Sequence, residues 1–266
     1  MGYFEELKKH ISTANKSIRP ASALILLYDI LFYLFAFLGL YAFYIKFVNS
    51  LMLLQGSELF EFASNPSESS LNATYAVMQK FYLSMIGYSL LLIIFLLVIW
   101  SLSRYLIWLN ITKKKFNIKT FLKFIPANTL WVMIISIPLV IMFIPFYNYV
   151  QIYGQSTQLP TGLDILRYIL LSTILILFYF TNMMHLAFIR KEKIFSPLWK
   201  GFKVGVLNAF PSFVIYLALL VLLYIVDFLI QFLNIGTVGK VLSFLLLLLS
   251  FSWIKIFYNS SMKKLD

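Results

Sequence analysis

The sequence contains no cysteine and only two histidines, and it is short of acidic residues. The lack of cysteine excludes disulfide bonds, thiolate metal sites and cysteine nucleophiles. Two histidines, His10 and His185, cannot build a histidine metal site by themselves. Asp and Glu total 10 against 22 Lys and Arg, and no Glu lies within a long apolar run. These shortages predict a protein with no metal and no cofactor.

Motifs of membrane-bound and serine hydrolases are missing as well. There is no His-Glu-x-x-His sequence, which an intramembrane metalloprotease needs for its zinc ligands and general base. There is no Gly-x-Ser-x-Gly elbow to expose an activated serine. A glutamate-based membrane protease would need glutamates within its spans, and this chain has none there. The sequence therefore favours a protein that is not an enzyme.

Hydrophobic residues are what the chain has in abundance, at 61% of the total, whereas only 12% are charged. Soluble domains have about 25% charged residues, so the composition excludes a soluble protein. A helix rises 1.5 Å per residue, so about 20 residues cross the roughly 30 Å hydrocarbon core of a membrane. Six apolar runs reach or approach that length, at 21–48, 81–109, 124–150, 165–189, 209–235 and 241–258. The sequence predicts an all-α membrane protein, with a bundle of six transmembrane helices in one integral membrane domain, 1–266.

The basic residues are distributed unevenly among the connections. Most of them precede the first run, join the second run to the third, join the fourth to the fifth, or follow the sixth. This asymmetry predicts that both termini are cytoplasmic, in the cell (plasma) membrane. It also favours an anionic inner leaflet, and not nucleic acid, as the partner for the net charge of +12. The residues predicted to contact anionic lipid are Lys8, Lys9, Lys16, Lys113, Lys114, Lys115, Lys119, Lys123, Arg190, Lys191, Lys193, Lys200 and Lys203.

The runs group into three hairpins, at approximately 1–110, 111–190 and 191–266. Each hairpin is opened by a basic segment whose apolar residues recur at helical spacing, which is typical of an interfacial helix in the headgroup plane. The apolar stripes are Phe4, Leu7, Ile11, Ala14 and Ile18; Phe116, Phe121 and Phe124; and Phe195, Trp199, Phe202 and Val206. Repetition of the pattern predicts a repeated unit, although it reveals no activity.

Each basic segment is followed by a proline, at Pro20, Pro126 and Pro211. Proline restricts the residue before it, so a break is expected between each surface helix and its span. The third run contains two further prolines, Pro138 and Pro145, which predict a kink. Such a kink can line a substrate cavity, but proline is also frequent in ordinary membrane helices.

Trp108, Trp199 and Trp253 fall at the predicted inner ends of runs or in a basic segment. Amphipathic rings prefer the headgroup level, so these tryptophans are expected at the inner interface.

Four ionisable residues within the runs are candidates for function: Asp29, Arg104, Asp227 and His185. A charge near the bilayer centre costs about 2.5–3.5 kcal/mol on insertion scales, so such residues normally face the bundle and find partners. Asp29 and Arg104 lie at similar depths on antiparallel neighbours, which predicts an ion pair. An ion-coupled site is the alternative. Arg167 is the candidate partner of Asp227 by depth, and His185 is expected to be an interfacial polar residue.

The order of basic segments and spans carries a family resemblance. Phe195, Trp199, Phe202, Asn208 and Pro211 form its clearest motif, and weaker echoes occur at Phe116, Phe121, Phe124, Pro126 and Asn128. In this arrangement the chain resembles the six-span membrane domain that accompanies some glycerophosphodiester phosphodiesterases, and related prokaryotic membrane families of unknown function. No phosphodiesterase active-site residue carries over. The resemblance implies an accessory or lipid-associated membrane protein.

Two functional hypotheses follow. The first is a non-enzymatic scaffold, assembly factor or lipid-interacting accessory subunit, which works through a protein partner or as a homo-oligomer. The alternative is a small secondary transporter with Asp29 and Asp227 as coupling carboxylates. A transporter should contain a polar cavity near the midplane, whereas a scaffold should have a dry core.

Overall fold

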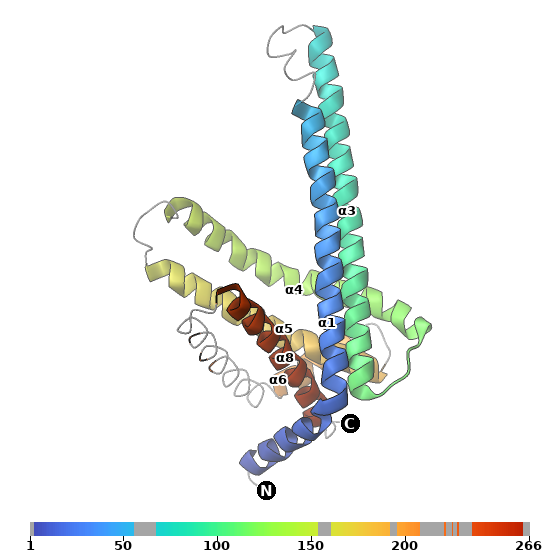
Figure 1. The fold of residues 1–266 in the computed structure, drawn as a ribbon, viewed down its shortest axis with the longest axis vertical. Helices are drawn as coiled ribbons and strands as arrows, with labels where there is room; N and C mark the ends of the chain where they lie inside the picture. Colours follow the sequence, from blue (N-terminus) through green and yellow to red (C-terminus); the bar gives the residue numbers. More distant parts are fainter. Residues whose placement is uncertain are drawn as a thin grey trace. The chain divides into compact units, whose positions relative to one another are not determined.

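The computed structural model describes residues 3–55, 68–153, 161–191, 196–207 and 236–262, together with the single positions 221, 225 and 228. The regular elements in these ranges are α-helices (Figure 1). They are α1 (Tyr3–Gln55), α3 (Glu68–Thr112), α4 (Ile118–Tyr153), α5 (Thr161–Lys191), α6 (Ser196–Leu207) and α8 (Gly236–Met262). The predicted all-α class is confirmed.

Within the described residues, four helical stretches are long and apolar enough to cross a membrane: Ala23–Met52, Thr74–Thr112, Ile118–Asn148 and Ser172–Arg190. They match the first four apolar runs and are what an integral membrane protein requires. Run 209–235 falls almost wholly outside the described residues, and run 241–258 lies within α8. The six-span arrangement in three hairpins therefore stays a prediction.

The chain forms two compact units. The smaller unit, Asp29–Ser103, is a helical hairpin in which α1 and α3 lie side by side (Figure 1). The larger unit comprises Met1–Tyr28 and Arg104–Asp266. It contains α4, α5, α6 and α8 with the amino-terminal part of α1 and the last turns of α3.

The larger unit has an aromatic core. Phe124 of α4 is fully buried, with its ring centroid 5.5 Å from that of Tyr105 of α3 and 5.1 Å from that of Phe188 of α5. Tyr179 of α5 lies 5.4 Å from Tyr258 of α8 in the same way. Lipid tails are as apolar as these side chains, so close packing, and not the hydrophobic effect, has to hold the helices together in a membrane.

A tight connection between α3 and α4 positions this core. Lys113 adopts a left-handed conformation with φ of 57°, and its N–H donates to the carbonyl of Asn110 at 3.3 Å. The N–H of Lys114 donates to the carbonyl of Leu109 at 3.0 Å, which completes a Schellman motif at the end of α3. Asn117 then caps α4, because its side-chain oxygen accepts from the N–H of Lys119 at 2.9 Å.

Helix α6 packs against α5 through a face that contains two glycines, and these two helices make the most extensive contact among the described helix pairs. A Cβ added to Gly201 would lie 2.7 Å from the Cα of Met184, and one added to Gly205 would lie 2.8 Å from the ring of Phe180. The hydroxyl of Tyr179 donates to the carbonyl of Gly205 at 2.7 Å. Glycines four residues apart permit such close backbone approach between membrane helices.

Two expectations about the basic segments are corrected. The helix does not end at Pro20 or Pro126, because α1 and α4 continue through both residues. Each proline removes one backbone hydrogen bond, and the neighbouring turns keep theirs. Pro211 lies outside the described residues. Phe121 and Phe124 do not lie on the membrane surface either, since both are buried in the core of the larger unit.

Candidate functional site

A buried hydrogen bond joins α4 to α5 in the larger unit. His185 and Asn128 are both fully buried, and His185 Nε2 lies 2.7 Å from Asn128 Oδ1. An amide oxygen can only accept, so the hydrogen is carried by Nε2. The ring of Phe124 covers the imidazole, with centroids 5.2 Å apart. His185 is thus buried within the protein, and its predicted depth near the membrane interface stays a prediction.

Two cations act on the same histidine. Arg104, at the start of the α3 part of the larger unit, and Lys255 of α8 both interact with His185 electrostatically. Arg104 is 9% exposed and Lys255 is 1% exposed. We call Arg104, Asn128, His185 and Lys255 the His185 cluster. It brings one side chain from each of four helices into the interior of the unit.

A second polar link lies on the same two helices as the histidine bond. Trp131 Nε1 of α4 donates to the hydroxyl of Thr181 of α5 at 2.9 Å, and both residues are buried. The hydroxyl of Thr181 in turn donates a hydrogen bond to the carbonyl of Leu177 at 2.7 Å. Asn182, also buried, donates to the carbonyl of Phe178 on its own helix. These bonds satisfy polar groups inside the membrane-length part of α5 and fix α4 against it.

The chemistry available to the His185 cluster is limited. A histidine held between an amide and an aromatic ring is fixed in its orientation. Among the described residues, no three His, Asp or Glu side chains come together as metal ligands. The cluster therefore has the character of a structural junction between four helices.

The other predicted intramembrane residues have mixed outcomes. Asp29 is 2% exposed and Arg104 is 9% exposed, so both are buried as their placement within spans predicts. They belong to different units, and their pairing stays a prediction. Asp227 lies outside the described residues, and the side chain of Arg167 does as well. Their pairing also stays a prediction.

Most described members of the predicted lipid-contact set are exposed. These are Lys8, Lys113, Lys114, Lys115, Lys119, Lys123, Lys200 and Lys203, and Arg190 is half-buried. The side chains of Lys9, Lys16 and Lys191 and the whole of Lys193 lie outside the described residues. Lys114 also has a second role, because its ammonium donates to the carbonyl of Ile189 near the end of α5 at 2.5 Å. A cation there complements the negative end of the helix dipole.

Several residues that matter in the larger unit carry only weak signals in the sequence. Lys255 lies one turn from the end of the last run, where a lysine usually reaches the interface, yet it is buried. Trp108 is buried too, and its Nε1 has no hydrogen-bond partner in the described part of the chain. Gly201 and Gly205 stand four residues apart on α6, and that spacing is the one pattern that could have predicted the α5–α6 contact.

Comparisons of the chain with protein-family models, with curated proteins and with solved structures give no match. The resemblance to the membrane domain that accompanies some glycerophosphodiester phosphodiesterases therefore stays a prediction from the sequence. Functional inference depends on the residues and geometry described above.

Proposed function

We propose that this protein is a non-enzymatic multi-pass membrane protein that acts as a lipid-interacting accessory subunit or scaffold. We further propose that it lies in the plasma membrane with six spans and both termini cytoplasmic. The proposal depends on how little of the spans the chain itself covers. None of the most apolar stretch of Thr74–Thr112 is buried, and the shares for Ala23–Met52 and Ile118–Asn148 are 11% and 6%.

Few residues in the apolar stretches of these three spans are fully buried. By contrast, half of the apolar stretch of Ser172–Arg190 is buried, because α5 is the helix that α4, α6 and α8 contact. A transporter usually encloses its substrate path with its own spans. A subunit or scaffold leaves its spans open to lipid and to partner helices, which is the arrangement that these exposures support.

Helix α6 supports the lipid part of the proposal. Its glycine face packs on α5, which leaves Trp199, Phe202 and Val206 exposed at 70%, 46% and 52%. Lys200 and Lys203 are exposed beside them. An apolar face flanked by lysines is typical of a helix that lies in the headgroup region of an anionic leaflet.

The test is lipid retention by the purified full-length protein. Native mass spectrometry would compare bound anionic and zwitterionic lipids for the wild type and for a variant with Lys119, Lys123, Lys200 and Lys203 all changed to Gln. At about 1 kcal/mol per basic residue near the surface, the variant should lose most of its anionic lipid. Lys80→Gln, which removes an exposed lysine of α3 outside this set, is the control and should lose no anionic lipid.

The transporter alternative predicts a different result in the same preparation. Protein reconstituted in vesicles with a pH-sensitive dye inside would carry a proton or ion flux above that of empty vesicles. That flux would disappear in Asp29→Asn and Asp227→Asn. A flux with this dependence would overturn the accessory proposal. Equal retention of anionic lipid by the wild type and the four-lysine variant would overturn it as well.

A further inference from the structure

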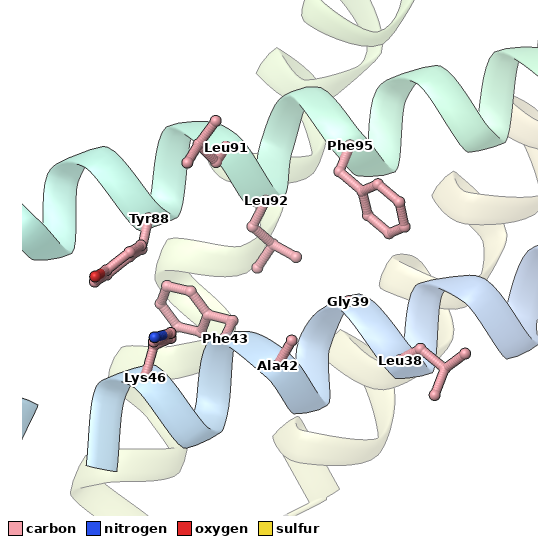
Figure 2. Close-up of a pocket in the computed structure, with 9 residues that line it drawn as sticks. All are labelled: Leu38, Gly39, Ala42, Phe43, Lys46, Tyr88, Leu91, Leu92 and Phe95. Carbon is pink, nitrogen blue, oxygen red and sulfur yellow. The ribbon is translucent and has the colours of Figure 1, made fainter. Parts of the chain in front are cut away.

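An apolar groove runs between α1 and α3 within the smaller unit. It has a volume of about 430 Å³ and is lined by residues of this hairpin alone (Figure 2). The lining from α1 begins at Leu38 and ends at Lys46, which is about 12 Å along a helix that rises 1.5 Å per residue. The groove is therefore short, and it is largely open to the surroundings of the hairpin.

The two ends of the groove differ in chemistry. Lys46 and Tyr88 lie at the same end, whereas Leu38 and Phe95 lie at the other (Figure 2). Lys46 carries the one charge among the described residues that line the groove. Between the ends the lining is apolar, with Ala42 and Leu92 on opposite walls. A ligand that fits would have an apolar tail and a negatively charged head.

A glycine gives the apolar end its shape. A Cβ added to Gly39 would lie 2.7 Å from Cε1 of Phe95 and 2.9 Å from its Cδ1. The Phe95 ring therefore lies directly over Gly39 and closes the apolar end instead of filling the groove. Real Cβ atoms essentially never approach that closely, so any side chain at position 39 would force the ring to move.

The depth of the groove within the span matches a membrane lipid. The span on α1 begins at Ala23, and Lys46 lies about 35 Å along the helix from there. That span ends at Met52, about 9 Å beyond Lys46, and its length of about 45 Å exceeds the hydrocarbon core of about 30 Å. With the excess shared between its two ends, Lys46 lies near the headgroup level while Leu38 and Gly39 remain among the acyl chains. Snorkelling of the lysine side chain favours the same placement.

We propose that this groove binds one anionic phospholipid, with an acyl chain between α1 and α3 and its phosphate at Lys46. The inference rests on the proposed function only in requiring that this hairpin spans a bilayer. It goes further by assigning a site on the side of the membrane opposite the basic segments. The hydroxyl of Tyr88, at the same end, can donate a second hydrogen bond to the headgroup.

A partner helix fits the groove less well than a lipid chain does. A helix with its side chains is about 10–12 Å across, as wide as this groove is long. Lipid tails and groove side chains are equally apolar, so transfer of a chain from bilayer to groove gains nothing from the hydrophobic effect. Selectivity must then come from the charged end, which makes Lys46 the residue that decides which lipid is retained.

The experiment uses full-length protein in vesicles of phosphatidylcholine that contain a trace of photoactivatable phosphatidylglycerol, with its diazirine in the acyl chain. Labelled peptides are mapped by mass spectrometry. Wild-type protein should be labelled within 38–46 and 88–95. Photoactivatable phosphatidylcholine at the same level should label these segments less. Lys46→Gln should reduce the phosphatidylglycerol label about fivefold, which is the value of one basic residue near the surface.

Two bulky substitutions test the groove itself. Ala42→Trp fills it from the α1 wall and should abolish the label, and Leu92→Trp fills it from the α3 wall. The matched controls are Ala76→Trp, at an exposed alanine of α3 outside the groove, and Lys80→Gln, at another exposed lysine. Both should be labelled like the wild type. A monodisperse elution profile is required of each variant, and Lys46→Gln provides the decision if both tryptophan variants misfold.

Other outcomes would overturn the site. Equal labelling by both lipids, unchanged in Lys46→Gln, would mean ordinary boundary lipid. Rapid disulfide formation by Ala42→Cys, with loss of label, would place a second copy of the chain in the groove. Failure here with anionic lipid still retained through Lys119, Lys123, Lys200 and Lys203 would remove only this site. Groove labelling that persists when those four lysines are changed to Gln would show that this site does not depend on them.

Discussion

His185 Nε2 lies 2.7 Å from Asn128 Oδ1, and this bond ties α5 to α4 where both residues are fully buried. The ring of Phe124 contacts both the imidazole of His185 and the ring of Phe188. A buried polar pair of this kind is costly to break, because loss of one partner leaves a buried donor or acceptor without a hydrogen bond.

Replacing Asn128 by Ala should therefore destabilise the larger unit. The change leaves His185 Nε2 without its acceptor, and the expected loss is about 1–3 kcal/mol. The measurement is thermal unfolding in detergent. Thr129→Ala is the matched control, because among the described residues its hydroxyl donates to the carbonyl of Ile125 on its own helix. Equal stability of the two variants would show that the histidine bond contributes little.

Part of this arrangement could be predicted from the sequence. Helix type and membrane class follow from run length and composition, which need no knowledge of neighbours. The placement of Phe121 and Phe124 could not be predicted, because an apolar stripe flanked by lysines is the same pattern on a membrane surface and on a protein core. The choice depends on Tyr105, whose ring lies 5.5 Å from both and which is distant in sequence.

The same limit applies to charged and small residues. A lysine near the end of a span, such as Lys255, can reach the headgroups or turn inward, and only the helices around it decide. Gly201 and Gly205 show a spacing that permits close packing, but the spacing does not name the partner helix. The burial of Asp29 could be predicted, because a carboxylate that far within a span has to avoid lipid.

Gly201→Ala should weaken the contact between α5 and α6. The new Cβ would lie 2.7 Å from the Cα of Met184, and a backbone atom cannot rotate away. Overpacking of this kind costs about 1–3 kcal/mol. Trypsin cleavage after Lys200 and Lys203 would report the release of α6.

Gly87→Ala is the control for that variant. No atom lies within 4 Å of the Cβ added there, and Gly87 is exposed on α3. Alanine is about 1 kcal/mol better than glycine in a helix, so this variant should be at least as stable as the wild type. If Gly201→Ala behaves like Gly87→Ala, the close approach of α6 to α5 is wrong.

Lys113→Gly should stabilise the protein. Lys113 holds a φ of 57° at the end of α3, and a left-handed conformation costs residues other than glycine about 1–2 kcal/mol. Part of that gain is offset by the greater freedom of glycine in the unfolded chain, which leaves a rise of up to about 1 kcal/mol. Lys115→Gly, in the same connection, gains no such relief and should lower the unfolding temperature slightly. An equal decrease in the unfolding temperature of Lys113→Gly and Lys115→Gly would contradict the Schellman motif.

The predicted pair of Asp29 and Arg104 is open to a double-mutant cycle. The sequence predicts similar depths for the two residues in antiparallel spans, and their side chains are 2% and 9% exposed. If they pair, Asp29→Asn leaves Arg104 a poorly compensated charge, with a penalty that reaches a few kcal/mol. Arg104→Gln should then cost less when Asp29 is already Asn than it does in the wild type, as thermal unfolding in detergent would measure. Additive losses would mean that the two do not interact. Asp29 would in that case be a buried carboxylate whose role lies elsewhere, and the flux measurement on Asp29→Asn would become the decisive test of the transporter alternative.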